Sequence, residues 1–284
     1  MTIALAGNPN SGKTTIFNNL TGSNQHVGNY PGVTVEKKEG RLKYQGYDIK
    51  VIDLPGTYSL TAYSPDEIVA RNVIIEEKPD LLVNVVDASN LNRNLYLTMQ
   101  LKELEVPMII VLNMADVAEQ SGITIDYNLL STLLGMPALR MVGTRKEGIR
   151  ELLDLLVGSI EGSIKKDDRR VSYPAVLEAE IQKLAEMLSV PSEDGDTADG
   201  NIVVVSNGTK YPSRWVAIKL LEKDSEVIKK VESLPESQKI MQQLELSRGS
   251  INKNLNQDSE MAIVEGRYAF IRGATHEAVR VQNK

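Results

Sequence analysis

The segment GNPNSGKT at residues 7–14 has the clearest capacity for chemistry in this sequence. It fits the pattern G-x-x-x-x-G-K-[ST], in which glycines let backbone N–H groups close around a phosphate. An apolar run at residues 2–6 precedes it and a helix-like segment follows, which is the context that the motif needs. We expect Lys13 to reach the β- and γ-phosphates and the Thr14 hydroxyl to bind Mg²⁺. The segment therefore predicts a nucleoside-triphosphate site.

A second motif, Asp-Leu-Pro-Gly at residues 53–56, stands at the end of a predicted strand. The Asp53 carboxylate can hold Mg²⁺ through water, and the Gly56 N–H can sense the γ-phosphate. Without the phosphate-binding loop upstream, the same residues would indicate only a turn that ends a strand. Their order and position favour the nucleotide interpretation.

A third motif, Asn-Met-Ala-Asp at residues 113–116, ends the next long apolar strand. The Asp116 carboxylate can accept both the ring N1–H and the exocyclic amine of guanine, whereas adenine presents a lone pair at N1. A site built on such polar groups discriminates strongly, because the wrong base leaves them unpaired. Asn113 and Asp116 therefore narrow the predicted activity from a nucleoside triphosphatase to a GTPase.

Between the first two motifs lies GNYPGVT at residues 28–34, where glycine and proline indicate a mobile loop. Thr34 is the candidate second hydroxyl ligand for Mg²⁺. Ordering of such a loop by the γ-phosphate and Mg²⁺ is the usual switch mechanism of GTPases. We therefore expect a nucleotide-dependent switch at this loop.

The catalytic position is unusual, because Thr57 follows Gly56 where many small GTPases have a glutamine that orients water. Threonine lacks that reach, and no arginine can be assigned as a finger in cis. We therefore expect slow intrinsic turnover, or a different source of positive charge. Asn10 offers a side-chain carbonyl beside the β- and γ-phosphates, where a monovalent cation could supply that charge.

The elements expected to position these motifs alternate between strands and helices. Strands are predicted at residues 2–6, 41–44, 49–53, 81–87, 108–113 and 138–142, and helices at 65–76, 92–105, 126–134 and 148–160. This alternation predicts an α/β P-loop GTPase domain with a doubly wound, mostly parallel sheet. A smaller all-helical domain should follow, with helices at 175–188, 213–222, 225–231, 236–246 and 259–272, while residues 202–205 are ambiguous. The predicted boundaries are 1–162 for the GTPase domain, 163–172 for a linker and 173–284 for the helical domain.

Composition excludes several other classes of protein. The 32 basic and 38 acidic residues give a net charge of −6, which argues mildly against a nucleic-acid binder. The absence of cysteine excludes disulfides, thiolate metal sites and cysteine nucleophiles, and two histidines are too few for a histidine-rich metal centre. No signal peptide or bilayer-spanning apolar run is found, so we expect this chain to be soluble. The acidic segment 193–200 lacks the spacing of an EF-hand.

These motifs together resemble the cytosolic N-terminal region of the FeoB family of ferrous-iron transporters. The resemblance rests on residues 7–15, 28–40, 53–60 and 113–116, of which the loop motif at 28–40 is the most specific. Most GTPases have lysine where Met114 stands, but the family commonly has methionine. In the second half, YPSRW at 211–215 and RYAFI at 267–271 resemble the family's helical domain. The match spans nearly the whole chain.

The resemblance implies a potassium-activated GTPase domain joined to a regulatory helical domain. In such proteins K⁺ is held by the residue matching Asn10, with backbone carbonyls at positions matching Gly28 and Tyr30. The fifth GTPase motif, usually Ser-Ala-x, would fall at 143–145, where this sequence matches poorly. The implied function is a switch at the cytoplasmic face of the membrane that regulates ferrous-iron uptake. Its expected partners are a transmembrane transport region in cis, small accessory iron-uptake proteins, or further copies of itself.

Two other interpretations stay open at this point. A soluble ribosome- or RNA-assembly GTPase shares the same motifs, although its appended domain should be basic and bind RNA. A nucleotide-dependent interaction module, in which hydrolysis only times the bound state, is the third. The candidate residues for binding guanine nucleotide, Mg²⁺ and K⁺ are Gly7, Asn8, Pro9, Asn10, Ser11, Gly12, Lys13, Thr14, Thr15, Gly28, Tyr30, Gly32, Val33, Thr34, Asp53, Leu54, Pro55, Gly56, Asn113, Met114, Asp116, Gly143, Thr144 and Arg145. Among them, Lys13, Asn10 (through K⁺), Thr34 and Gly56 are the expected catalytic residues.

Overall fold

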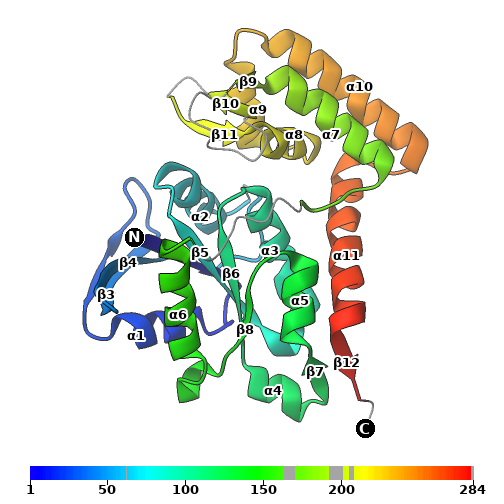
Figure 1. Cartoon of the computed structure of the whole chain (residues 1–284). Helices are drawn as coiled ribbons and strands as arrows, with labels where there is room; N and C mark the ends of the chain where they lie inside the picture. Colours follow the sequence, from blue (N-terminus) through cyan, green and yellow to red (C-terminus); the bar gives the residue numbers. More distant parts are fainter. Residues whose placement is uncertain (62, 163–169, 192–200, 205–207, 283–284) are drawn as a thin grey trace. The chain divides into compact units, whose positions relative to one another are not determined.

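The computed structural model describes residues 1–61, 63–162, 170–191, 201–204 and 208–282. The chain forms two compact units (Figure 1). The first contains Met1–Leu101, Val106–Arg169 and Ile271–Lys284, and the second contains Lys102–Glu105 and Arg170–Phe270. The C-terminal segment therefore returns to the first unit. The linker expected at 163–172 falls largely outside the described residues, so the domain boundaries stay a prediction.

A seven-stranded sheet forms the centre of the first unit, in the order β2-β3-β4-β1-β5-β6-β8. Its strands are β1 (Thr2–Gly7), β2 (Gln25–Asn29), β3 (Glu36–Tyr44), β4 (Tyr47–Asp53), β5 (Leu81–Asp87), β6 (Met108–Asn113) and β8 (Ala138–Arg140). Neighbouring strands from β4 to β8 run parallel, and β3 is antiparallel to β2 and β4. Strands β5 and β6 are buried almost throughout, as the near-continuous apolar runs predicted. The parallel strands end at one edge, where ligands bind in such sheets.

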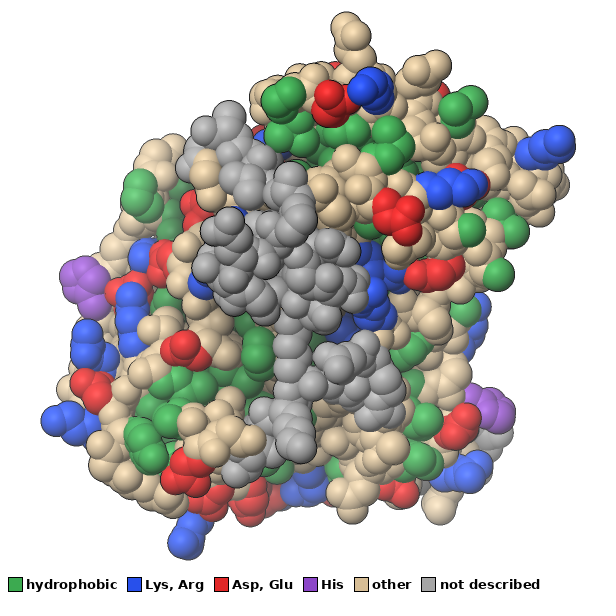
Figure 2. Space-filling view, turned by 45° about the horizontal axis from the view of Figure 1, so that its top comes forward, with side chains coloured by type: hydrophobic (Ala, Val, Ile, Leu, Met, Phe, Trp, Pro, Cys, Tyr) green, Lys and Arg blue, Asp and Glu red, His purple; other side chains and the backbone are tan. Residues whose placement is uncertain are grey.

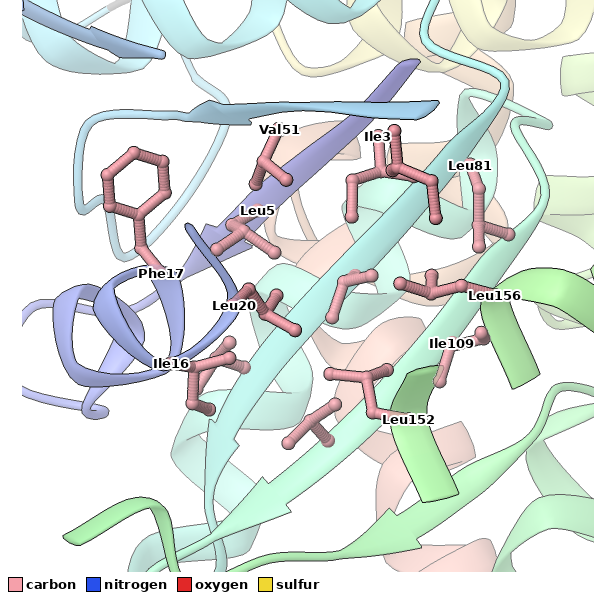
Figure 3. Packing of buried hydrophobic residues seen from close by; sticks show 14 of the residues in the cluster. Ile3, Leu5, Ile16, Phe17, Leu20, Val51, Leu81, Ile109, Leu152 and Leu156 are labelled. Carbon is pink, nitrogen blue, oxygen red and sulfur yellow. The ribbon is translucent and has the colours of Figure 1, made fainter. Parts of the chain in front are cut away.

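Helices cover both faces of this sheet. They are α1 (Lys13–Thr21), α2 (Pro65–Glu76), α3 (Leu91–Glu103), α4 (Ala115–Gln120), α5 (Tyr127–Leu134) and α6 (Ile149–Ile160). Phe17 of α1 and Leu152 and Leu156 of α6 pack on one face of the sheet (Figure 3). Since strand side chains alternate between faces, Asn84 of β5 points to the other face, where Thr98 of α3 donates a 2.6 Å hydrogen bond to it.

The C-terminal segment joins the first unit through a second, two-stranded sheet. Strand β12 (Val279–Val281) pairs antiparallel with β7 (Ile123–Ile125). Helix α11 (Ser259–Ala278) leads directly into β12 and contributes residues to both units. The boundary of the compact units therefore falls within this helix, at Phe270 and Ile271.

The second unit consists mainly of helices. These are α7 (Ala175–Leu188), α8 (Ser213–Leu221), α9 (Ser225–Glu232), α10 (Ser237–Leu255) and the first part of α11. Trp215 of α8 and Leu244 of α10 are buried in its core. A fully buried arginine, Arg267, donates hydrogen bonds to Glu103 and Glu222. The second unit thus contains a fully buried, ion-paired arginine.

The predicted fold class, a P-loop α/β domain followed by a smaller helical domain, is confirmed, with local differences. Helix α10 continues beyond the predicted end at residue 246, because Ser247 and Ile251 extend the buried stripe begun by Ile240 and Leu244. The helical domain also contains a three-stranded sheet of β9 (Val190–Pro191), β10 (Asn201–Val204) and β11 (Lys210–Pro212). The ambiguous segment 202–205 therefore belongs to a strand as far as it is described. The acidic segment 193–200 lies outside the described residues.

The surface in view in Figure 2 has Lys and Arg side chains interspersed with Asp and Glu. This mixture agrees with the modest net charge of −6. Among the described residues, no helix has both the length and the apolar character needed to cross a bilayer.

Candidate nucleotide site

The phosphate-binding loop joins β1 to α1, and its glycines are required by the backbone. Gly12 has a φ of 87°, in the left-handed region, and precedes the first residue of α1. A Cβ on Gly7 would lie 2.5 Å from the carbonyl oxygen of Val85 in the neighbouring strand. Only glycine therefore permits this close packing of the loop against β5. The loop directs the N-terminus of α1, with its positive dipole end, toward the expected phosphate position.

Lys13 and Asp53 form a buried ion pair at the edge of the sheet. Asp53 ends β4, which is aligned with β1 through the pair Leu5 and Asp53. Burial raises the pKa of Asp53 above its ordinary value, and the charge of Lys13 opposes only part of that rise. The first two motifs, 40 residues apart, thus meet side chain to side chain. Thr14 follows Lys13 and is exposed at the start of α1, so a hydroxyl and a carboxylate, the hard oxygen donors that Mg²⁺ prefers, stand at this edge.

Several buried polar atoms of the loop have no hydrogen-bond partner in the part of the chain that the structure describes. They are both amide atoms of Asn8 and the hydroxyl oxygen of Ser11, residues that are 4% and 1% exposed. An unpaired buried polar group is costly, about 1–3 kcal/mol, and natural proteins rarely retain one without a reason. These atoms fit a loop that is complete only with a polar ligand. Asn10, in contrast, is exposed and has a positive φ of 66°.

At the base end of the site, Asn113 holds two loops together. Its Nδ2 donates to the carbonyl oxygen of Ser11 at 2.9 Å, and its Oδ1 accepts from the N–H of Gly143 at 2.9 Å. Asn19 of α1 also donates to the Gly143 carbonyl at 2.8 Å. A Cβ on Gly12 would lie 2.1 Å from Asn113 Nδ2, which gives a second reason for that glycine. A hydrogen bond from Asn113 to the Ser11 carbonyl thus links the third motif to the first.

The residues 143–145 form a short 3₁₀ helix beside Asp116. The guanidinium of Arg145 lies 3.5 Å from the Asp116 carboxylate. Met114 has a φ of 58°, and this left-handed residue turns the chain from β6 into α4, so that Asp116 falls in the first turn of that helix. Although their sequence matches the fifth GTPase motif poorly, residues 143–145 contact Asn113 and Asp116, the two residues expected to recognise guanine.

The expected switch loop, 28–34, is only partly a loop. Gly28 lies in the edge strand β2, opposite Lys37 of β3. Tyr30 is buried, its N–H donates to the carbonyl of Val35, and its own carbonyl accepts from Val33. Gly32 has a positive φ of 76°, and Thr34 is exposed. Thr34 is thus exposed as Thr14 is, and its role as the second hydroxyl ligand of Mg²⁺ stays a prediction.

The segment after Gly56 lies against the phosphate-binding loop. A Cβ on Gly56 would lie 3.4 Å from the backbone of Pro9, and the N–H of Thr57 donates to the Gly7 carbonyl at 3.2 Å. Thr57 is 5% exposed, so its side chain is packed inside rather than presented to a water molecule. This burial agrees with the expectation that Thr57 does not take the place of the usual glutamine.

Sequence reasoning missed two side chains that hold this segment. Glu67 of α2 accepts from the N–H groups of Tyr63 and Ser64 and from the Ser59 hydroxyl, while Ser64 caps the helix. The Ser-x-x-Glu spacing at 64–67, a capping box, was available as a signal in the sequence. Gln100 of α3 accepts from the N–H of Leu60, and no local pattern pointed to it.

A phosphate-binding loop between β1 and α1, an aspartate at the end of β4 and Asn-x-x-Asp after β6 define a P-loop G-domain, the nucleotide-binding domain of GTPases. Residues 1–156 match the family model of ferrous iron transport protein B, and residues 173–280 match that of the FeoB cytosolic helical domain. The chain belongs to the FeoB family of ferrous-iron transport proteins. This confirms the resemblance drawn from the motifs.

Named relatives and solved structures agree with this assignment. The Fe(2+) transport protein A/Fe(2+) transporter FeoB fusion protein of Porphyromonas gingivalis is 42% identical over 99% of this chain and 32% of its own length. The Fe(2+) transporter FeoB of Escherichia coli is 44% identical over 79% of this chain and 27% of its own. The chain thus spans about a third or less of these relatives. A GDP-bound mutant of the S. thermophilus FeoB G-domain is 37% identical, covers 99% of this chain and 100% of its own, and has a TM-score of 0.84. The cytosolic domain of T. maritima FeoB in its GMPPNP form is 30% identical over 99% of each chain, with a TM-score of 0.77.

Proposed function

We propose that this chain binds GTP, hydrolyses it slowly, and acts as a potassium-activated switch that regulates ferrous-iron uptake. The observation that carries the proposal is Asn113, which ties the phosphate-binding loop to residues 143–145 beside Asp116. One side chain thereby joins the phosphate and base ends of a single site. The GDP-bound and GMPPNP-bound neighbours support guanine nucleotide as the ligand.

Each residue of the site has a proposed role. The backbone of residues 7–15 holds the phosphates and Lys13 neutralises them. Thr14, Thr34 and Asp53 would hold Mg²⁺. The N–H of Gly56 contacts the γ-phosphate. Asn113, Met114, Asp116 and residues 143–145 hold the base, with Asp116 reading the guanine edge. Because Lys13 and Asp53 form an ion pair here, phosphate and Mg²⁺ would have to replace that contact.

Catalysis is proposed to need positive charge in addition to that of Lys13, because no arginine is assigned as a finger in cis. Thr57 is buried, so it is not proposed as the residue that orients water. Asn10 is exposed in the loop and, with the carbonyls of Gly28 and Tyr30, would hold K⁺. A bound K⁺ supplies charge stabilisation in the transition state. The side chain of Asn10 itself contributes an oxygen ligand.

The test is GTP turnover in potassium chloride and in sodium chloride at equal ionic strength, for the wild type and for Asn10→Ala. We expect potassium to stimulate the wild type and to lose its effect in Asn10→Ala. Asn252→Ala, at an exposed position in α10, is the matched control and should keep the full stimulation. Equal wild-type rates in the two salts would exclude potassium activation. GTP binding without potassium stimulation would leave a slow switch that needs another activator.

The switch is proposed to act on a membrane transport region in cis, at the cytoplasmic face of the membrane. The relatives named Fe(2+) transporter FeoB are about three times as long as this chain, which leaves room for such a region in them. Small accessory iron-uptake proteins and further copies of the chain are additional proposed partners. The RNA-assembly alternative loses support, because both halves of the chain match FeoB family models and its net charge is −6.

A further inference from the structure

Gln100 is a polar residue in the buried face of α3, with an exposed fraction of zero. Two other buried polar residues of this helix have clear local partners. Thr98 donates to Asn84 in the sheet, and Asn94 accepts from the N–H of Asp87. Gln100 differs from both, because its partner is Leu60, in the segment that follows Gly56. We call residues 57–61 the post-Gly56 segment.

Helix α3 holds the post-Gly56 segment at two points. Inside the protein, Oε1 of Gln100 accepts from the N–H of Leu60 at 2.8 Å, and the Leu60 side chain is 1% exposed. Nearer the surface, the guanidinium of Arg93 lies 4.5 Å from the ring centroid of Tyr58. Arg93 and Gln100 are seven positions apart, close to two helical turns, and so share one side of α3. The helix therefore presents a polar surface to a segment that begins one residue after the proposed γ-phosphate sensor.

Only half of the Gln100 amide is used in this contact. Its Nε2 is buried and has no hydrogen-bond partner among the described residues. A buried amide donor without a partner destabilises the arrangement that contains it. Replacement by a hydrophobic residue would remove that penalty, but it would also remove the acceptor for Leu60. The side chain is thus suited to an arrangement of its neighbours in which both halves are paired.

We propose that Gln100 is a positioning residue that favours the GTP-bound arrangement of the post-Gly56 segment. In the arrangement seen here, Gln100 makes one hydrogen bond, to the N–H of Leu60. When the N–H of Gly56 binds the γ-phosphate and the residues after it rearrange, a backbone carbonyl of the segment accepts from Nε2, so that both halves of the amide are paired. The nucleotide state then decides how many hydrogen bonds Gln100 makes. This inference rests on the proposed function, because it requires a chain that distinguishes GTP from GDP.

The test compares Gln100→Met with Thr98→Val. Methionine has nearly the shape of glutamine, has no donor, and offers only a weakly accepting thioether sulfur. Thr98→Val is the matched control, since it removes an equally buried hydrogen bond from the same helix without touching the segment. Two quantities are measured for each protein. One is the ratio of the dissociation constants for GDP and a non-hydrolysable GTP analogue, and the other is hydrogen exchange of the Leu60 amide.

We expect Gln100→Met to lower the preference for the GTP analogue over GDP by about 5- to 10-fold, the effect of one buried hydrogen bond. The Leu60 amide should exchange faster in this variant, and Thr98→Val should keep the wild-type ratio within about 2-fold. Faster exchange with an unchanged ratio would overturn the inference, since Gln100 would then have a merely structural role. An unchanged exchange rate, or a ratio shifted toward the GTP analogue, would overturn it as well. A wild type that binds neither nucleotide would instead refute the proposed function.

Discussion

Two regions of this molecule contain buried polar groups, which are paired within the chain in one region and unpaired in the other. In the second unit, Arg267 is fully buried and donates to Glu103 at 2.7 and 2.9 Å, and to Glu222. In the phosphate-binding loop, Asn8 and Ser11 are also buried, yet their side-chain atoms lack partners among the described residues. The charges of the Arg267 network are paired within the chain, whereas the unpaired atoms of Asn8 and Ser11 fit a loop that a polar ligand completes. The two regions should therefore respond differently to mutation.

The largest effect is expected from Arg267→Met. This change removes the cation that Glu103 and Glu222 share and leaves Glu222 paired with Lys219 alone. Breaking a buried ion pair on one side destabilises a protein by about 3–5 kcal/mol. Urea unfolding followed by the fluorescence of Trp215 measures it, since this is the chain's single tryptophan and lies in the core of the same unit.

The control for this variant is Lys239→Met, in an ion pair with Glu236 whose side chains are 74% and 64% exposed. Exposed pairs contribute little, so the free energy of unfolding should stay close to that of the wild type. Similar losses from Arg267→Met and Lys239→Met would show that the buried network is not a structural centre of the second unit.

A smaller and pH-dependent effect is expected from Glu222→Gln. Burial raises the pKa of Glu222, but the charges of Arg267 and Lys219 lower it by more, to about 2. Because the folded-state pKa lies below the unfolded value, ionised Glu222 stabilises the folded state above pH 4.5, and this contribution is lost as the pH falls toward 2. The wild type should therefore exceed Glu222→Gln in unfolding free energy at pH 7, with the difference narrowing below pH 4.5. Urea unfolding of both proteins across this pH range measures the difference, and a difference independent of pH would contradict the assignment.

The same contrast explains which parts of the molecule could be predicted from its sequence. The phosphate-binding loop, Asp53 and Asn113 were found because each stands at a fixed position after an apolar strand. Their meeting at one edge follows from the parallel sheet. The alternation of predicted strands and helices was enough to predict the class of fold. Local sequence patterns were therefore sufficient to predict the nucleotide site.

The contacts that join distant parts of the chain could not be predicted in this way. Glu103 and Arg267 are 164 positions apart, and each alone has the pattern of a solvated charge on a helix. The contact of Gln100 with Leu60 could not be predicted for the same reason, since the two residues are 40 positions apart. Residues 28 and 29, the end of edge strand β2, fell within the loop predicted at 28–34 from its glycine and proline. Strand β2 has little apolar character and gains its structure from pairing with β3. In each case the structure depends on a contact between separate segments of the chain.

The smallest effect on the ligand-free chain, and the sharpest test of the comparison, is expected from Asn8→Ala. Because both amide atoms of Asn8 lack partners in the described structure, their removal takes away no hydrogen bond, and the unfolding free energy without nucleotide should change by less than about 1 kcal/mol. With saturating GDP and Mg²⁺, the variant should gain about 1–2 kcal/mol less stabilisation than the wild type, since an amide paired by the ligand would be missing. Thermal unfolding with and without nucleotide measures both quantities. A large loss in the ligand-free chain would mean that Asn8 is structural, like Arg267. An unchanged nucleotide effect would mean that its buried amide does not serve the ligand.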